Sequence, residues 1–267
     1  MIELLALDVD GTLIDETVTI GNRVRQAVTQ AQEKGVTVTL ATGRMLEATV
    51  PFARDLEIEA PLICYQGGLI QAPDAEVPLY RAMMDPGVIQ EVLAWRAEHG
   101  WHIVLYADDA LFIAEPRYPE SFYRDLLGEN LHWTDDLSSV LDQHRPAKFL
   151  FIAEPIQADR IEAAMRQRFE GQMEIVRSHA NFVEGNPLGV SKGDALRRLA
   201  DHLGIPQKRV MAIGDQGNDV AMIAWAGVGV AMGNASPAAT AVANWIAPPL
   251  SEDGAAVAIE HFILSPS

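Results

Sequence analysis

The hydrophobic pattern at the start of the chain alternates between short apolar runs and amphipathic stretches. An apolar run opens the chain at Leu4 to Val9, and apolar residues then recur at helical spacing from Ile20 to Ala31. Gly35 predicts the end of that helix, and Val36 to Ala41 reads as a second strand. A strand, a helix and a strand in this order build parallel sheets with right-handed crossovers. This part of the chain therefore predicts an α/β fold.

The alternation continues for a further helix and strand and then returns near the end of the chain. A helix is expected at Leu46 to Leu56 and a short strand at Leu62 to Tyr65. In the last third, an amphipathic helix is expected to end at Gly204. Strands are expected after it at Val210–Ile213 and Gly227–Met232, and helices at Val220–Trp225, after Pro237 and after Asp253. Together the two ends predict one doubly wound, Rossmann-like parallel sheet.

The middle of the chain has a different pattern. Asp85 as cap, Pro86 in the first turn and Gly100 as stop predict one helix. The apolar runs that follow are close together and predict paired strands at 101–106, 111–114, 148–153, 174–178 and 181–184. A second helix is expected among them at 156–169. We therefore expect a catalytic core from residues 1–82 and 185–267, and an inserted α+β unit at residues 83–184.

Composition and charge narrow the class of protein. The chain has 267 residues, 49% of them hydrophobic, which is enough for a sizeable core and a second unit. Its formal net charge of −17 argues against nucleic acid or an anionic membrane as the main partner. The single cysteine, Cys64, excludes an intrachain disulfide and reads as a small buried residue. The opening apolar run meets Asp8 too early for a secretion signal or a membrane span, so we expect a cytoplasmic protein. The sequence does not indicate the oligomeric state.

Acidic residues follow two of the predicted strands. Asp8 and Asp10 lie at the end of the first strand and point the same way, because strand side chains alternate between faces. Asp215 and Asp219 belong to the stretch GDQGND after a late strand. The carboxyl ends of parallel strands share one edge of a sheet, so the four carboxylates are expected to converge. That much negative charge requires a hard divalent cation, and oxygen ligands favour Mg²⁺ over Zn²⁺.

Hydrogen-bond donors occur at comparable positions. Thr42 lies in ATGR after the second strand, with the backbone amides of Gly43 and its neighbours, and Lys192 lies in SKG at the start of a helix. These groups suit a phosphate. Arg44 either reaches a second anionic group or pairs with a surface carboxylate.

These four stretches resemble the motifs of the haloacid dehalogenase-like (HAD) superfamily of phosphohydrolases. The pattern DxDGT matches Asp8 to Thr12, the Thr/Ser motif matches Thr42, the lysine motif matches Lys192, and GDxxND matches Gly214 to Asp219. The roughly hundred-residue unit between the second and third motifs, with GVSKG and VGVAMGNA after it, resembles the Cof-type branch with a type IIB cap. The resemblance covers nearly the whole chain.

The resemblance implies a role for each motif residue. Asp8 would be the nucleophile that forms an aspartyl-phosphate, and Asp10 the general acid and then base. Mg²⁺ would be held by the Asp8 carboxylate, the Asp10 backbone carbonyl and Asp215, with Asp219 bound directly or through water. The groups expected to stabilise the phosphoryl charge or bind phosphate are Thr42, Gly43, Arg44, Lys192 and Asn218.

One position departs from the family pattern. Many relatives carry Asn-Gly after the strand that precedes the cap, whereas this chain has Gln66-Gly67, so no substrate contact is carried over to that loop. Near the end of the inserted unit, His179, Asn181 and Glu184 either face substrate or are solvated loop residues.

The implied activity is Mg²⁺-dependent hydrolysis of a small phosphorylated metabolite, with the inserted unit acting as a cap that sets specificity. The family suggests sugar phosphates, pyridoxal phosphate or flavin mononucleotide as substrate classes, and the sequence does not choose among them. A phosphotransferase or phosphomutase of the same architecture is the alternative enzyme. A non-catalytic sensor of a phosphorylated ligand is the alternative outside enzymology.

Overall fold

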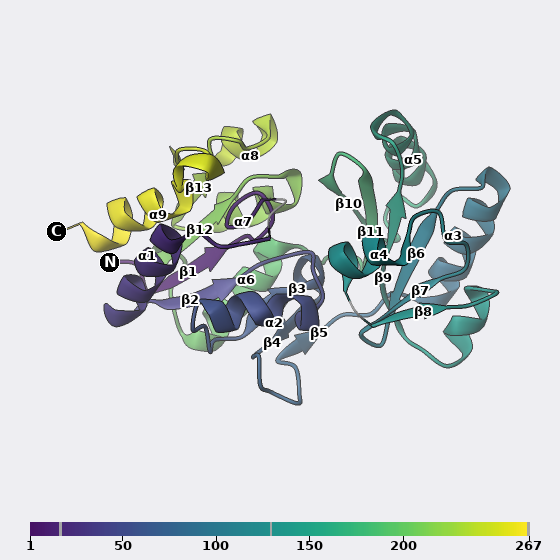
Figure 1. The fold of residues 1–267 in the computed structure, drawn as a ribbon, viewed down its shortest axis with the longest axis horizontal. Coiled ribbons are helices and arrows are strands. Elements are labelled where there is room, and N and C mark those ends of the chain that lie inside the picture. The colour runs from purple at the N-terminus through teal and green to yellow at the C-terminus, as the bar shows by residue number, and fades with distance from the viewer. Residues whose placement is uncertain (16–17, 129, 266–267) are drawn as a thin grey trace. The chain divides into compact units, whose positions relative to one another are not determined.

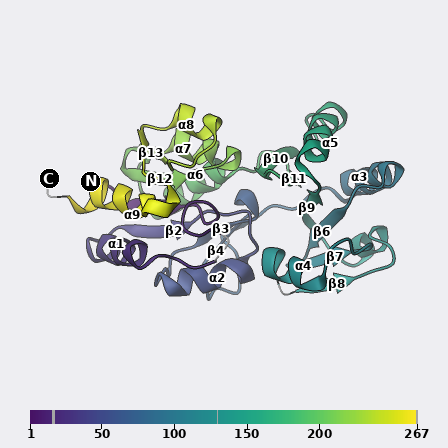
Figure 2. The same ribbon diagram turned by 45° about the horizontal axis from the view of Figure 1, so that its top comes forward.

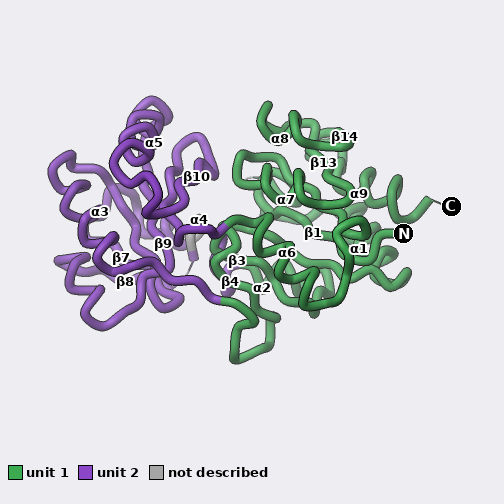
Figure 3. The backbone as a smooth tube through the Cα atoms, turned by 180° about the vertical axis from the view of Figure 1, so that it is seen from behind, with its two compact units in different colours: residues 1–43, 49–80, 191–267 green, residues 44–48, 81–190 purple. Residues whose placement is uncertain are grey.

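The computed structural model describes residues 1–15, 18–128 and 130–265, and its contacts divide the chain into two compact units (Figure 3). Unit 1 comprises Met1–Gly43, Thr49–Tyr80 and Ser191–Ser267, and unit 2 comprises Arg44–Ala48 and Arg81–Val190. The long segment of unit 2, Arg81–Val190, contains the insertion predicted at 83–184 and extends a few residues beyond it at each end. The short segment at residues 44–48 has no sequence signal of its own.

Unit 1 is built on a five-stranded parallel sheet (Figure 1). The strand order is β14-β13-β12-β1-β2, so the chain starts inside the sheet and extends it in both directions. This arrangement confirms the predicted doubly wound α/β fold. The strands are β1 (Leu4–Leu7), β2 (Thr37–Leu40), β12 (Val210–Gly214), β13 (Val228–Ala231) and β14 (Trp245–Ile246).

Helices pack on this sheet through apolar faces. Leu196 and Leu199 of α6 belong to one buried cluster with Leu4 of β1, and α1 packs against α9 near the two chain ends (Figure 1). The helix α6 begins where the Ser191 hydroxyl accepts a hydrogen bond from the Asp194 N–H, and it ends at left-handed Gly204, as predicted. The helices of unit 1 are α1 (Asn22–Glu33), α2 (Leu46–Asp55), which begins in unit 2, α6 (Lys192–Leu203), α7 (Val220–Trp225), α8 (Pro237–Val242) and α9 (Gly254–Ile259).

A small three-stranded sheet adjoins the main one. It contains β3 (Leu62–Cys64), β4 (Leu69–Gln71) and β5 (Tyr80–Arg81), and an isolated parallel bridge joins Ala41 to Ile63. A 3₁₀ turn at Tyr65–Gly67 connects β3 to β4. Cys64 is fully buried in β3, as its apolar surroundings predict.

Unit 2 is a six-stranded sheet with α3 and α5 packed on one face (Figure 2). The strand order is β10-β11-β9-β6-β7-β8, and one apolar cluster joins this sheet to α3 and α5. Trp95 and Trp101 lie in this cluster with ring centroids 4.6 Å apart. The strands are β6 (Ile103–Ala107), β7 (Ala110–Ile113), β8 (Leu131–Trp133), β9 (Pro146–Ile152), β10 (Glu174–His179) and β11 (Phe182–Asn186), and the helices are α3 (Pro86–His99), α4 (Glu120–Leu127) and α5 (Pro155–Arg168).

The other face of the unit 2 sheet carries a buried ion pair. Lys148 Nζ lies 2.6 Å from Glu184 Oε2 and 4.6 Å from the centroid of the Tyr106 ring. Both charged residues are buried, at 3% and 4% exposure. Their strand neighbours Phe149 and Val183 belong to the apolar cluster, so alternation directs Lys148 and Glu184 away from it. Glu184 is therefore a sheet residue and not a solvated loop residue.

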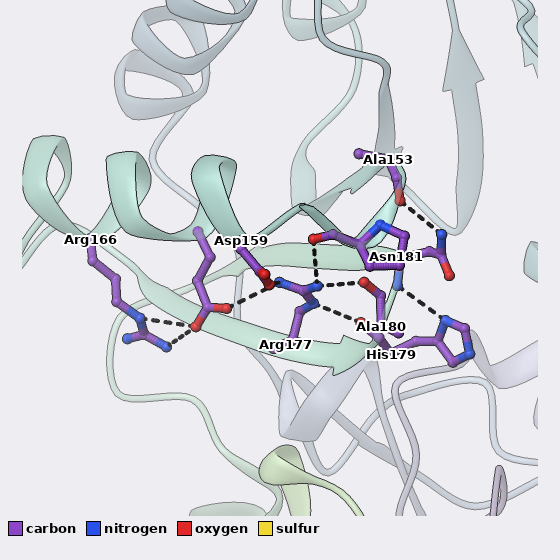
Figure 4. A network of polar contacts seen from close by, with 9 residues as sticks. Ala153, Asp159, Arg166, Arg177, His179, Ala180 and Asn181 are labelled. Carbon is purple, nitrogen blue, oxygen red and sulfur yellow. Dashed lines mark hydrogen bonds and ion pairs between the residues drawn. The ribbon is translucent and has the colours of Figure 1, made fainter. Parts of the chain in front are cut away.

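The turn between β10 and β11 is fixed by its own polar groups (Figure 4). Arg177 pairs with Asp159 of α5 at 3.1 Å and donates to the backbone carbonyls of His179 and Ala180. The Asn181 side chain donates to the Ala153 carbonyl at 2.9 Å. Arg177 and Asn181 thus tie this turn to α5 and to the end of β9.

Among the residues that the structure describes, no helix combines the length and the apolar character needed to cross a membrane.

Candidate active site

The first strand delivers Asp8 into a buried position. Asp8 follows β1 directly, its N–H donates to the Ile213 carbonyl at 3.0 Å, and its side chain is almost completely buried. The chain then turns at Gly11, whose φ is +87°. A Cβ at Gly11 would collide with the carboxylate of Asp215, so glycine is required for the close approach of the two loops.

The loop after β12 holds two further carboxylates. Asp219 Oδ2 accepts hydrogen bonds from the N–H groups of Asp215 and Gln216, each at 2.9 Å, which closes the loop on itself. The Asp215 carboxylate accepts from Gln216 Nε2 at 3.0 Å and from Thr12 Oγ1 at 3.4 Å. Asp215 and Asp219 are both buried. Thr12 and Gln216 therefore orient the Asp215 carboxylate, a role that we did not predict for them although Thr12 stands in the DVDGT stretch.

Lys192 joins the two acidic loops. It is the first residue of α6 and is 1% exposed, and its Nζ donates to Asp8 Oδ1 and to Asp219 Oδ1, each at 2.6 Å. The next residue, Gly193, lets α6 approach α7 closely, because a Cβ there would lie 2.5 Å from the carbonyl carbon of Ala221. Helix packing thus fixes the position of the ammonium group.

Three of the predicted acidic residues could hold a metal ion together. One carboxylate oxygen from each of Asp8, Asp215 and Asp219 lies within 4.8 Å of the others. Three buried carboxylates beside one ammonium leave an excess of negative charge, and an all-oxygen donor set of this kind fits a hard divalent cation. Asp10 is exposed and does not belong to this set of side chains; the metal contact predicted for it uses its backbone carbonyl.

The pKa shifts in the cluster follow from burial and charge crowding. Burial, followed by the charge of Asp219, raises the pKa of Asp8 well above its usual value. The same two causes raise the pKa of Asp215 to about 6. Burial lowers the pKa of Lys192, but the charges of Asp219 and Asp8 outweigh burial, so the net shift is upward and the ammonium stays charged. A cation bound beside these carboxylates would favour their ionised forms.

The loop after β2 supplies the predicted phosphate donors. Thr42 is fully buried, its N–H donates to the Ile63 carbonyl at 2.8 Å, and its carbonyl accepts from the Gln66 N–H at 3.0 Å. Gly43 is half-buried and lies against the Gln66 side chain. Asn218, also half-buried, donates from Nδ2 to Gln66 Oε1 at 3.0 Å. Gln66 therefore contacts both the Thr42 loop and the Asn218 loop, a position that the sequence did not predict.

Arg44 belongs to unit 2, and its predicted contact with an anionic group stays a prediction.

The sequence of the chain matches a known family of hydrolases. The sequence pattern of the haloacid dehalogenase-like hydrolases matches residues 5–259, which is nearly the whole chain. The chain belongs to this family. As a haloacid dehalogenase-like hydrolase it has named relatives that are phosphatases, which confirms the predicted class of enzyme.

Two phosphatases with named substrates are similar to this hydrolase over most of their length. A 5-amino-6-(5-phospho-D-ribitylamino)uracil phosphatase from Bacillus subtilis is 32% identical over 263 residues, covering 98% of this chain and 96% of the relative. An HMP-PP phosphatase from Cronobacter sakazakii is 31% identical over 239 residues, covering 89% and 86%.

A solved structure shows the same fold. A sugar phosphatase of HAD subclass IIB superposes with a TM-score of 0.83 at 23% identity, covering 97% of this chain and 98% of that one. The predicted architecture, a doubly wound core with an inserted α+β unit, is therefore confirmed.

Proposed function

We propose that this hydrolase is a Mg²⁺-dependent phosphomonoesterase that acts on a small phosphorylated metabolite through an aspartyl-phosphate on Asp8. The observation that carries the proposal is the buried Asp8 carboxylate, bound to Lys192 and gathered with Asp215 and Asp219. The proposed nucleophile Asp8, the Lys192 ammonium and the carboxylates that could hold a metal therefore lie together at the carboxyl ends of β1 and β12.

In the first step an Asp8 oxygen attacks phosphorus, and the bond from phosphorus to the leaving alcohol oxygen breaks. Asp10 gives its proton to that oxygen as general acid. Asp10 is two residues from Asp8 and exposed, so it can exchange protons with solvent. The covalent intermediate divides one difficult displacement into two easier steps.

In the second step Asp10, now a carboxylate, removes a proton from water, which attacks the phosphorus of the aspartyl-phosphate. The bond from phosphorus to Asp8 breaks and inorganic phosphate is released, with Asp8 restored.

Positive charge at the phosphoryl group is needed in both steps. Lys192, held at 2.6 Å from Asp8, supplies one fixed charge, and the Thr42 hydroxyl and the Gly43 amide supply hydrogen-bond donors. Mg²⁺ would be held by the carboxylates of Asp8 and Asp215 and the Asp10 backbone carbonyl, with Asp219 bound directly or through water, and it would supply positive charge that stabilises the phosphoryl oxygens.

The substrate is a monoester of a small metabolite. The two named relatives act on a ribityl phosphate and on HMP-PP. Of the three substrate classes expected from the sequence, the ribityl phosphate of the first relative favours flavin mononucleotide or a sugar phosphate over pyridoxal phosphate. We assign the choice of that group to the inserted unit, by its likeness to type IIB caps.

A phosphate-release screen tests the proposal. Purified protein with Mg²⁺ is incubated with sugar phosphates, ribityl phosphates, pyridoxal phosphate, flavin mononucleotide and an aryl phosphate. We expect release of inorganic phosphate from at least one metabolite, and none in EDTA. If none of these compounds, including the aryl phosphate, were hydrolysed, the hypothesis of a non-catalytic sensor of a phosphorylated ligand would be preferred.

The same assay separates hydrolysis from phosphoryl transfer. A sugar acceptor is added and the products are analysed. Phosphate released to water at an unchanged rate supports the phosphatase, whereas a phosphorylated acceptor in place of free phosphate supports the phosphotransferase.

A further inference from the structure

Gln66 has a backbone conformation that costs free energy. Its φ and ψ are 58° and 20°, and Tyr65 before it and Gly67 after it also have positive φ, at 52° and 103°. Glycine adopts this region freely, but two successive bulky residues do so only where the surroundings hold them. Such strain is concentrated at binding and active sites. The conformation also buries the Gln66 side chain to 2% exposure.

The buried side chain of Gln66 connects two loops of the site. Its Oε1 accepts a hydrogen bond from Asn218 Nδ2 at 3.0 Å, and its amide lies where any side chain at position 43 would have to go. Its backbone N–H is bound to the Thr42 carbonyl at 3.0 Å. One residue thus sets the separation between the loop after β2 and the loop after β12.

The hydrogen bond from Asn218 also decides which way the Asn218 amide faces. Because an amide oxygen only accepts, Gln66 Oε1 holds the NH₂ group of Asn218 toward itself. Asn218 Oδ1 is left buried and without a hydrogen-bond partner among the described residues. A buried amide oxygen of this kind is costly unless a water molecule or a bound ligand supplies a donor, and at Asn218 that oxygen lies in the loop that carries Asp215 and Asp219.

We propose that Gln66 is a positioning residue that orients the Asn218 amide for the phosphorylated ligand and keeps the Thr42–Gly43 loop at its working distance. The inference rests on the proposed function, because the ligand it orients Asn218 for is the phosphate ester. It gives a role to the position at which this chain departs from the Asn-Gly pair of many relatives. The longer glutamine side chain spans the gap to Asn218.

Gln66→Met tests the inference, because methionine keeps the length and volume and removes the acceptor. We expect kcat/KM to fall about tenfold, the effect of losing one hydrogen bond that fixes a ligand-binding group. In an Asn218→Ala background the same substitution should change kcat/KM less than about twofold, because methionine still fills the space beside Gly43 and only the hydrogen bond to Asn218 is lost. Multiplying effects in the double variant would overturn the proposal.

Gln71→Met is the matched control. Gln71 is also a buried glutamine, one strand further on, but its Nε2 donates to the Ala75 carbonyl at 2.6 Å and not to a residue of the site. We expect Gln71→Met to lower the melting temperature and leave kcat/KM unchanged. An equal loss of kcat/KM in both variants would mean that Gln66 only supports the fold.

Binding of inorganic phosphate separates failure of this inference from failure of the proposed function. Titration calorimetry with Mg²⁺ present is applied to the wild type, both single variants and the Gln66→Met/Asn218→Ala double variant. We expect about tenfold weaker phosphate binding in Gln66→Met and no further loss in the double variant. Wild-type affinity in Gln66→Met would overturn the inference even if the protein hydrolysed no substrate, whereas absence of hydrolysis bears only on the proposed function.

Discussion

At the scale of single residues, the charge state of the site depends on one lysine. Lys192 is bound to two buried carboxylates, and a third lies close by. Burial of a lone ammonium would favour its neutral form, but the paired acids keep it charged. The site therefore keeps a fixed positive charge before any ligand arrives.

Asp8→Asn is expected to reduce turnover by roughly a thousandfold or more, because an amide cannot attack phosphorus. Phosphate release is the measurement, and circular dichroism checks that the variant is folded. Near-normal activity in the folded variant would remove Asp8 as the nucleophile.

His102 is a second residue whose protonation is set by its surroundings. The Tyr123 hydroxyl oxygen accepts from the N–H groups of Arg117 and Tyr118, so its own hydrogen is directed to His102 Nε2 at 2.9 Å. That nitrogen must be unprotonated to accept. Burial, followed by the charges of Arg117 and Arg96, lowers the pKa of His102 to about 4.

Stability should therefore fall with acid as His102 is forced to protonate. Between about pH 6.5 and pH 4 the unfolded chain binds a proton at this residue and the folded chain does not, so protonation favours unfolding. We expect His102→Gln to reduce the acid-induced loss of unfolding free energy by on the order of 2 kcal/mol. Urea unfolding of both proteins at several pH values measures it, and parallel pH curves would contradict the assignment.

At the scale of secondary-structure elements, a buried ion pair links β9 to β11. Removing Lys148 takes a charge-assisted hydrogen bond away from the buried Glu184 carboxylate, so Lys148→Met is expected to destabilise the protein by about 1.5–3 kcal/mol. Urea unfolding measures the change.

Two further variants control for this result. Arg166→Ala breaks an exposed i,i+4 pair with Glu162 and should cost less than about 1 kcal/mol. A Lys148→Met/Glu184→Leu variant should recover most of the lost stability, because the buried carboxylate that has lost the Lys148 ammonium is replaced by an apolar side chain. A Lys148→Met variant no less stable than Arg166→Ala would show that the pair contributes little.

Elements with end signals could be predicted from the sequence, and those without could not. The α3 helix starts where Asp85 accepts from the Gly87 N–H at 2.7 Å and stops at left-handed Gly100, so both predicted ends are correct. The α4 helix is only 8 residues long and starts after Pro119, which provides no side-chain cap. The sequence pattern did not predict this helix.

At the scale of the whole molecule, the site is assembled from distant parts of the chain. The acidic and basic motifs could be predicted because each interrupts an apolar pattern at a strand end or a helix start. Gln66 could not, since nothing in the letters Tyr-Gln-Gly indicates a left-handed backbone or a bond to Asn218, 152 positions away. The motifs thus predict which groups react, and the structure adds residues, such as Gln66, that contact the loops carrying them.

Mg²⁺ is expected to raise the melting temperature of the whole protein. The ion would bind the folded state, in which Asp8, Asp215 and Asp219 are together, and would relieve the repulsion between their carboxylates. The gain should be on the order of 2–3 kcal/mol when Mg²⁺ exceeds its dissociation constant about 100-fold. Differential scanning calorimetry with Mg²⁺ and with EDTA measures it. The same shift in Asp215→Asn would argue against a metal site at these residues.

The pairing of β1 with β12 also governs when the protein can fold during its synthesis. Leu4 lies opposite Val210, so one edge of the first strand has no partner until more than two hundred residues have been made. At about 5–20 residues per second, this apolar edge waits on the order of 10–40 s. Unpaired strand edges readily join other chains, and pairing of β1 with β2 covers only the opposite edge, so the edge that faces β12 stays open to association with other chains during this time. The enzyme can become active only after the last third of its chain has left the ribosome.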